Sequence, residues 1–178
     1  RHTFVPLDEM TTEVRDEAGI VIRADLIPGA APLVHELKRR GYPLALVADG
    51  HAASFRNVLT RHGLYHLFDA YAISELVGAR KPHPSMFLHA LAALGVSPEE
   101  HGQVLMVGNN LEADVKGANA LGLVSVWLDW SPRRSKVPAD ESQVPRYTIK
   151  TPLELIPLVE WLEAMPQQRS AAPPVEDG

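Results

Sequence analysis

The chain has no cysteine among its 178 residues. This absence excludes disulfide bonds, thiolate nucleophiles and cysteine-ligated zinc, and it fits a reducing compartment. Positive charge is also scarce, because 17 Lys and Arg stand against 22 Asp and Glu, for a formal net charge of −5. Such a balance offers no large positive field to hold nucleic acid or acidic lipid. We therefore expect a cytoplasmic protein with neither nucleic acid nor membrane as a partner.

Long apolar runs are lacking as well. No run approaches the roughly 20 residues that a membrane-spanning helix needs, and no signal peptide is visible. What is present is an ordinary globular composition, with 46% hydrophobic and 22% charged residues. The length suits one domain with a proper core. Residues 166–178 are rich in Pro, Ala and polar residues, so we expect a disordered tail there.

Between residues 28 and 165, short apolar runs alternate with amphipathic segments. The apolar runs predict strands buried on both faces at 43–50, 71–74, 103–108 and 123–130. Helical periodicity predicts helices at 28–41, 54–63, 84–95, 111–122 and 151–163, the second of them capped by Ser54. The alternation predicts a three-layer α/β/α sandwich around a Rossmann-like parallel sheet. The preceding segment, 1–27, is mixed and has no clear place in this pattern.

Ligands of such sheets bind beyond the carboxyl ends of the strands. Polar residues that directly follow the predicted strands are therefore candidate site residues. These candidates are Ala48-Asp49-Gly50 at the end of the first run, Lys81 after the second, Asn109, Asn110 and Asp114 after the third, and Asp129 at the end of the fourth.

Three segments together, in this order, resemble the haloacid dehalogenase superfamily, whose members are mostly magnesium-dependent phosphatases. "LIPGAAPLVHELKRRGYPLALVADG" is similar to the family's Pro-Gly helix and its second motif, a strand that ends in Ser or Thr. "ISELVGARKPHPSMFLHALAALGV" is similar to the third motif, a Lys followed by Pro, and "VLMVGNNLEADVKGANALGL" to the fourth, Gly-Asp-x-x-x-x-Asp. The resemblance covers roughly residues 26–163 and implies a core domain of this type at 28–165.

The resemblance implies a chemistry and assigns residues to it. In this family an Asp after the first strand attacks phosphorus, and a second Asp two residues later acts as general acid and base. Lys81 matches the lysine that binds phosphate and orients the nucleophile, and Ala48, Asp49 and Gly50 match the phosphate-binding loop. Asn109 and Asp114 match the pair that holds Mg2+. The implied substrate is a small phosphorylated molecule.

Two of these positions depart from the family pattern. Ala48 stands where Ser or Thr donates to phosphate, so only the backbone N–H groups of Asp49 and Gly50 remain there as donors. Asn109 stands where the first metal carboxylate is expected. An amide oxygen coordinates a hard cation but adds no charge, so we expect weakened Mg2+ affinity.

The first motif, Asp-x-Asp-Gly-Thr, does not occur in the chain. Asp8 is followed at the plus-two position by Met10, and Asp25 by Ile27, so neither brings the second acid. The segment 1–27 is then the remnant of a cap, in a fragment whose upstream part carries the motif, or it holds a degenerate first strand at 3–7 or 20–22. Alternatively, a homo-oligomer or another partner chain completes the sheet.

Three functions stay open at this point. The first is a Mg2+-dependent phosphatase that acts through an aspartyl-phosphate, provided that an upstream first motif exists. The second is a catalytically inactive relative that keeps the fold for binding or assembly, which the absent nucleophile, Ala48 and Asn109 favour. The third and weakest is a 2-haloacid dehalogenase, because those relatives carry Asn in the fourth motif.

Overall fold

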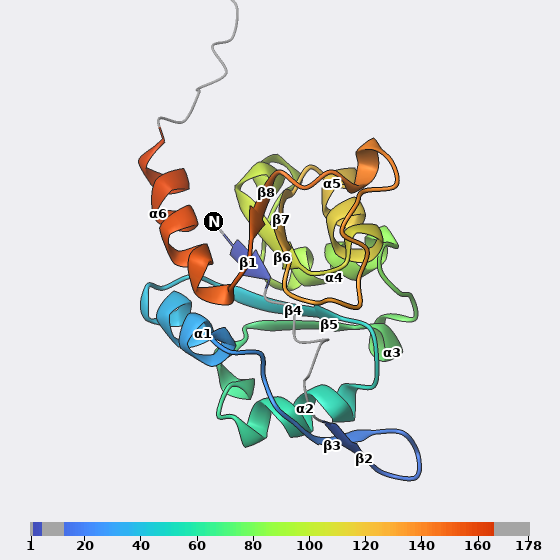
Figure 1. Ribbon diagram of the computed structural model, residues 1–178. Helices are drawn as coiled ribbons and strands as arrows, with labels where there is room; N and C mark the ends of the chain where they lie inside the picture. Colours follow the sequence, from blue (N-terminus) through green and yellow to red (C-terminus); the bar gives the residue numbers. More distant parts are fainter. Residues whose placement is uncertain (1, 5–12, 166–178) are drawn as a thin grey trace, which may run out of the picture.

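The computed structural model describes residues 2–4 and 13–165, and its main sheet has six parallel strands in the order β5-β4-β1-β6-β7-β8 (Figure 1). These strands are β1 (His2–Phe4), β4 (Leu44–Ala48), β5 (Ala70–Ile73), β6 (Val104–Gly108), β7 (Val124–Leu128) and β8 (Tyr147–Ile149). The helices are α1 (Ala30–Arg39), α2 (Ala52–Arg61), α3 (Ser74–Val77), α4 (Pro84–Ala93), α5 (Lys116–Ala120) and α6 (Leu155–Ala164). The predicted α/β class with a parallel sheet is confirmed.

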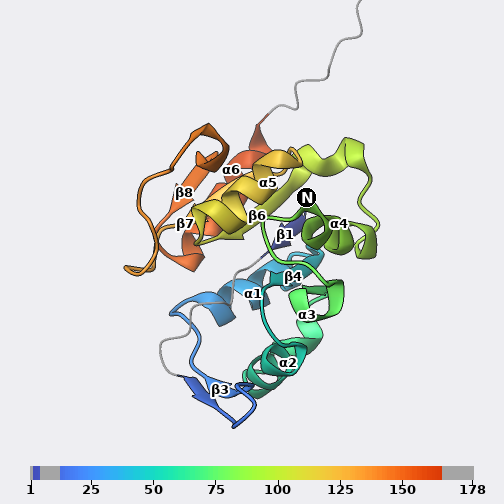
Figure 2. The same cartoon turned by 90° about the vertical axis from the view of Figure 1, so that its right-hand side faces the viewer.

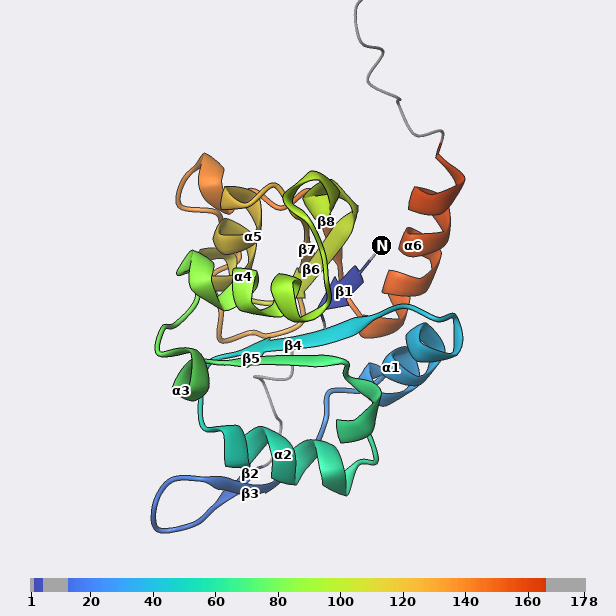
Figure 3. The same ribbon diagram turned by 180° about the vertical axis from the view of Figure 1, so that it is seen from behind.

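Helices cover both faces of the sheet, which gives the three layers. Successive residues of a strand point to opposite faces, so Leu44 and Leu46 pack in one core and Ala45 and Val47 in the other. Helices α1, α2 and α6 supply the first core, and α4 and α5 the second. Figures 1 and 3 show α1 and α6 on one side of the sheet and α4 and α5 on the other, and the latter two face the viewer in Figure 2.

The chain itself fills the central slot of the sheet. Strand β1 pairs in parallel with β4, where Thr3 lies opposite Leu44, and with β6, where Thr3 lies opposite Leu105. Part of the segment 1–27 thus belongs to the core sheet, and no strand from a partner chain is needed between β4 and β6. The alternative that placed residues 20–22 in this slot is wrong, because Val21 and Ile22 belong to a separate hairpin.

This hairpin consists of β2 (Glu13–Arg15) and β3 (Val21–Ala24), and it lies outside the main sheet. It packs on α2 (Figures 1 and 3), and three side chains of that helix and its end hold it there. Ser54 Oγ accepts from the Val21 N–H at 2.9 Å, and Asn57 Nδ2 donates to the Val21 carbonyl at 3.1 Å. His62 Nε2 lies 2.8 Å from the Ala24 carbonyl, so this ring nitrogen is the donor. The hairpin is therefore fixed to α2 rather than to the sheet.

Ser54 corrects one prediction about α2. The helix begins at Ala52 with His51 as its N-cap residue, so Ser54 is inside the helix and does not cap it. Its hydroxyl is buried and serves the hairpin instead.

Two regions singled out in the sequence lie outside the described residues, namely Asp8 and the tail at 166–178. Asp25 is described, and it is exposed on the connection that follows β3. Among the helices that the structure describes, none has the length and apolar character needed to cross a membrane.

Candidate functional site

An ion pair between Lys81 and Asp114 lies at the centre of the candidate site. Lys81 Nζ donates to Asp114 Oδ1 at 2.7 Å, and the two side chains are only 2% and 1% exposed. The sequence nominated both residues separately, and the structure brings them together from loops 33 positions apart. Burying two charges costs free energy unless they are paired and hydrogen-bonded. Their pairing therefore allows both charges to lie buried between the loops.

Asp114 is held in place by the turn that follows β6. Residues Leu111–Val115 form a π-helical turn, a conformation that is often found at functional sites. Asn110 caps this turn, because its Oδ1 accepts from the N–H groups of Glu112 and Ala113 at 3.1 and 3.2 Å. Asp114 Oδ2 in turn accepts from the Asn110 N–H at 3.0 Å. Both carboxylate oxygens of Asp114 are thus engaged, one by a charge and one by the backbone.

Gly108, the last residue of β6, leaves the space that Asp114 occupies. A Cβ atom built on Gly108 would lie 2.3 Å from Cβ, Cγ and Oδ2 of Asp114. Side chains in a close-packed interior cannot absorb such an overlap without moving. The glycine is therefore required by the position of the acid.

We expect Gly108→Ala to lower the free energy of unfolding by about 1–3 kcal/mol, because overpacking a buried site costs about this much. Urea denaturation measures the change. The matched control is Gly102→Ala, since a Cβ at Gly102 meets nothing within 4 Å. A loss that is equal in the two variants would contradict the assigned role of Gly108.

Asn109 follows Gly108 and is 4% exposed. Its backbone carbonyl accepts from Trp127 Nε1 at 3.1 Å. Its side-chain Oδ1 is buried and has no hydrogen-bond partner among the described residues. Buried polar atoms are almost always satisfied, so this oxygen is a ready acceptor for a cation or another donor that reaches the site.

The described residues offer suitable ligands for Mg2+, but their charges make its binding weak. The orphaned Asn109 Oδ1 and the Asp114 carboxylate are oxygen ligands of the kind that this ion prefers. However, the amide is neutral and Lys81 already compensates the carboxylate. Nowhere in residues 2–4 and 13–165 do three His, Asp or Glu side chains come together as a metal site. A cation held here would therefore be held weakly.

The loop after β4 meets the ion pair from the opposite side of β1. Ala48 is the last strand residue and is buried. Asp49 Oδ1 accepts from the Lys81 N–H at 3.1 Å, so this acid braces the lysine loop. The Gly50 N–H donates to Ser74 Oγ at 2.9 Å. In this structure the serine hydroxyl thus accepts from the N–H group that the resemblance assigns to phosphate.

Sequence reasoning missed Ser74 and Glu75, which follow β5. Both line an open pocket of about 340 Å³ together with Gly50, His51 and Arg80. His51 Nδ1 lies 2.9 Å from Glu75 Oε1, and the Ala52 N–H donates to Glu75 Oε2 at 2.8 Å, which together hold the pKa of Glu75 below its usual value. Ser74 directly follows a strand, so the strand-end rule that selected Asp49 would also have selected it.

Asp129, at the end of β7, takes no part in this group. Its carboxylate is paired with Lys136 and Lys150, and these hydrogen bonds lower its pKa. The residues that the structure does gather are thus Asp49, Lys81, Asn109 and Asp114.

Comparison with known proteins adds a family to this geometry. The family model described as haloacid dehalogenase-like hydrolase matches residues 3–122. The chain is 35% identical over 132 residues to the glyceraldehyde 3-phosphate phosphatase of Methanopyrus kandleri, which is 74% of this chain and 55% of that protein. It is 43% identical over 107 residues to the phosphoserine phosphatase of Thermus thermophilus, which is 60% of this chain and 42% of that protein.

Solved structures lead to the same fold. A phosphatase of this family from Thermococcus onnurineus superposes with a TM-score of 0.64 at 32% identity, over 76% of this chain and 59% of that one. The chain therefore spans about half the length of the curated relatives that it matches.

Proposed function

Since this chain belongs to the haloacid dehalogenase-like hydrolases, we propose that it is a phosphatase-type hydrolase that acts on a small phosphorylated molecule. The observation that carries the proposal is the buried Lys81–Asp114 pair at the carboxyl edge of the sheet. It lies in a chain whose curated relatives are named phosphatases. A paired ammonium at a strand end has a clear use in such an enzyme, because it meets the negative oxygens of a phosphoryl group.

In this proposal the Lys81 ammonium stabilises the negative charge of the phosphoryl group, and Asp114 holds that ammonium in position. A fixed charge in a site that largely excludes water stabilises developing charge without reorganisation. The Asp49 carboxylate holds the other end of this residue, because it accepts from the Lys81 backbone N–H. The attacking group is not assigned, because Asp8 lies outside the described residues and Asp25 is an exposed residue of the connection that follows β3.

Mg2+ belongs to the same proposal. When bound, the ion supplies a Lewis acid that neutralises phosphoryl charge. Asn109 and Asp114 are the described residues that would hold it, one through the free amide oxygen and one through its carboxylate.

We expect the purified chain to release phosphate from p-nitrophenyl phosphate and from small phosphomonoesters, and EDTA to lower the rate. Phosphate release, measured with and without added Mg2+, checks this. Lys81→Met, prepared in the same way, gives the background from contaminating phosphatases. Activity that equals this background would contradict the proposal, and halide release from a 2-haloacid would replace it with a dehalogenase.

A non-catalytic binding protein is the second candidate. Three observations favour it, namely the missing hydroxyl at Ala48, the neutral amide at Asn109 and the engagement of the Gly50 N–H by Ser74. It predicts calorimetric binding of a phosphomonoester without any turnover. The same preparation thus separates the two candidates.

A further inference from the structure

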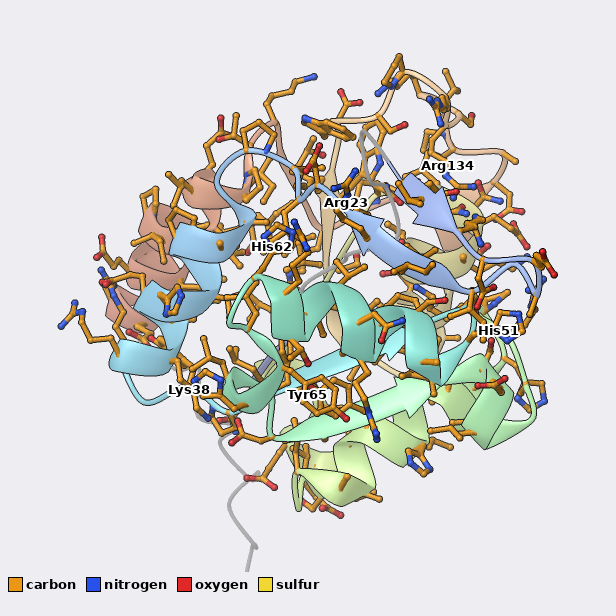
Figure 4. All side chains as sticks on the ribbon, turned by 90° about the horizontal axis from the view of Figure 1, so that it is seen from below. Arg23, Lys38, His51, His62, Tyr65 and Arg134 are labelled. Atoms are coloured by element: carbon orange, nitrogen blue, oxygen red, sulfur yellow. The ribbon has the colours of Figure 1, made fainter. Side chains whose placement is uncertain are left out.

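A second pocket separates the β2–β3 hairpin from the loop that follows β4. Its volume is about 100 Å³, and its lining includes Glu13 and Arg15 of β2 and Asp49 and Gly50 of the loop. Figure 4 shows the hairpin lying across α2, with His51 at one end of the helix and His62 at the other. The pocket therefore opens beside Asp49, the residue that braces Lys81.

The hairpin wall of this pocket carries both signs of charge. Arg15 Nε donates to Glu13 Oε1 at 2.7 Å, and Arg15 Nη1 donates to the Gly19 carbonyl at 2.7 Å. Among the described residues, nothing accepts a hydrogen bond from Arg15 Nη2. The side chains of Arg15 and Glu13 are 50% and 38% exposed, so a ligand can reach them. Across the pocket, Asp49 adds a second carboxylate, and it is half-buried.

Hydrogen bonds fix this wall in position. Ser54 and Asn57 hold both backbone polar groups of Val21, which also lines the pocket. Ser54 itself is 7% exposed and lines the pocket floor. Because α2 starts directly after the Asp49 loop, the same helix sets the distance between the charged wall and the candidate site.

We propose that this pocket binds the leaving group of the substrate and selects one that carries both an ammonium and a carboxylate, that is, an amino-acid moiety. The inference rests on the proposed phosphatase function. The Nη2 group of Arg15, which has no acceptor among the described residues, suits a carboxylate, and Glu13 with Asp49 suits an ammonium. A group with only one of these charges makes only one of the two pairings and lies near a charge of its own sign, which selects against it.

Four phosphomonoesters of similar size test the charge requirement. They are O-phosphoserine with both charges, 3-phosphoglycerate with the carboxylate, O-phosphoethanolamine with the ammonium, and glycerol 3-phosphate with neither. We expect kcat/KM to be up to about fivefold higher for O-phosphoserine than for each singly charged ester, because one partly exposed charge pair is worth up to about this much, and to be lowest for glycerol 3-phosphate, which makes neither pair. Equal kcat/KM values for all four would overturn the inference and leave the phosphatase proposal standing.

Substitutions locate the selectivity. We expect Arg15→Gln to lower kcat/KM for O-phosphoserine and 3-phosphoglycerate by up to about fivefold, mainly through KM, and to leave glycerol 3-phosphate unchanged. The matched control is Arg23→Gln, because Arg23 is an exposed arginine of the same hairpin that does not line the pocket (Figure 4). Equal effects of the two substitutions would overturn the inference.

Ser54→Ala tests the fixation of the wall separately. We expect it to raise KM for O-phosphoserine and to leave KM for p-nitrophenyl phosphate unchanged, whereas general unfolding would impair both. If no ester is turned over, the phosphatase proposal fails. Calorimetric binding of O-phosphoserine that Arg15→Gln weakens and Arg23→Gln does not would then still support the pocket, and its absence would overturn that too.

Discussion

Lys81→Met is expected to abolish phosphate release and to lower the free energy of unfolding by about 3–5 kcal/mol. The reason is the pairing of Lys81 with Asp114, because removing one partner of a buried ion pair leaves the other charge uncompensated. Methionine keeps the length and most of the volume of the lysine stem, so packing loss contributes little. Urea denaturation and the phosphatase assay measure the two effects.

Two controls separate the buried charge from the loss of a lysine. Lys116 pairs with Glu112 on the protein surface at 2.8 Å, and Lys116→Met is expected to cost only about 0.3–0.5 kcal/mol. Adding Asp114→Asn to Lys81→Met removes the stranded charge and keeps an acceptor for the Asn110 N–H. The double variant is therefore expected to be more stable than Lys81→Met alone while remaining inactive, and a double variant that is less stable would refute this account.

Asn109→Asp is expected to lower the Mg2+ concentration for half-maximal stabilisation at least tenfold. The substitution adds the charge that the site lacks, and ligand charge is what sets the affinity for such cations. Without Mg2+, a second buried carboxylate has to share the single ammonium of Lys81, so we expect the melting temperature of Asn109→Asp to fall below that of the unaltered chain. Thermal unfolding across a Mg2+ titration measures both effects, because a ligand that binds only the folded state raises the melting temperature.

The control for this experiment is Asn109→Leu. Replacing an unsatisfied buried amide by an apolar group of similar volume is nearly neutral or stabilising, so we expect the fold to persist and the Mg2+ response to vanish. A melting temperature of Asn109→Asp that is the same with and without Mg2+ would show that no cation binds at Asn109.

Sequence patterns predicted the strands that are buried on both faces, because these are continuously apolar. Strands β4, β6 and β7 all lie within predicted runs. Strand β2 was missed because all three of its residues are exposed, so no apolar alternation marks it, and the strand predicted at 20–22 was therefore assigned to the main sheet instead of to a hairpin. Strand β8 has three residues, which is too short for any periodicity, whereas β1 overlaps the alternative that placed a degenerate first strand at 3–7.

The candidate site was predictable in its members and not in its contacts. Lys81 and Asp114 stood out because each follows a buried strand in a recognisable motif. That they neutralise each other, and that Ser74 takes the Gly50 N–H, depends on where loops from different strands meet in space. The charged wall from Glu13 and Arg15 belongs to the hairpin, and no strand-end rule extends to an element outside the main sheet.

The central position of β1 separates the loop that follows β4 from the loop that follows β6. Neighbouring strands lie about 4.8 Å apart, so β4 and β6, with β1 between them, are separated by roughly 10 Å. Lys81 spans this distance, because its backbone N–H donates to Asp49, which follows β4, and its ammonium donates to Asp114, which follows β6. One lysine thus links the two groups of loops and sets the width of the site. Any change that moves β4 and β6 apart or closer together therefore alters the position of the whole Lys81 side chain.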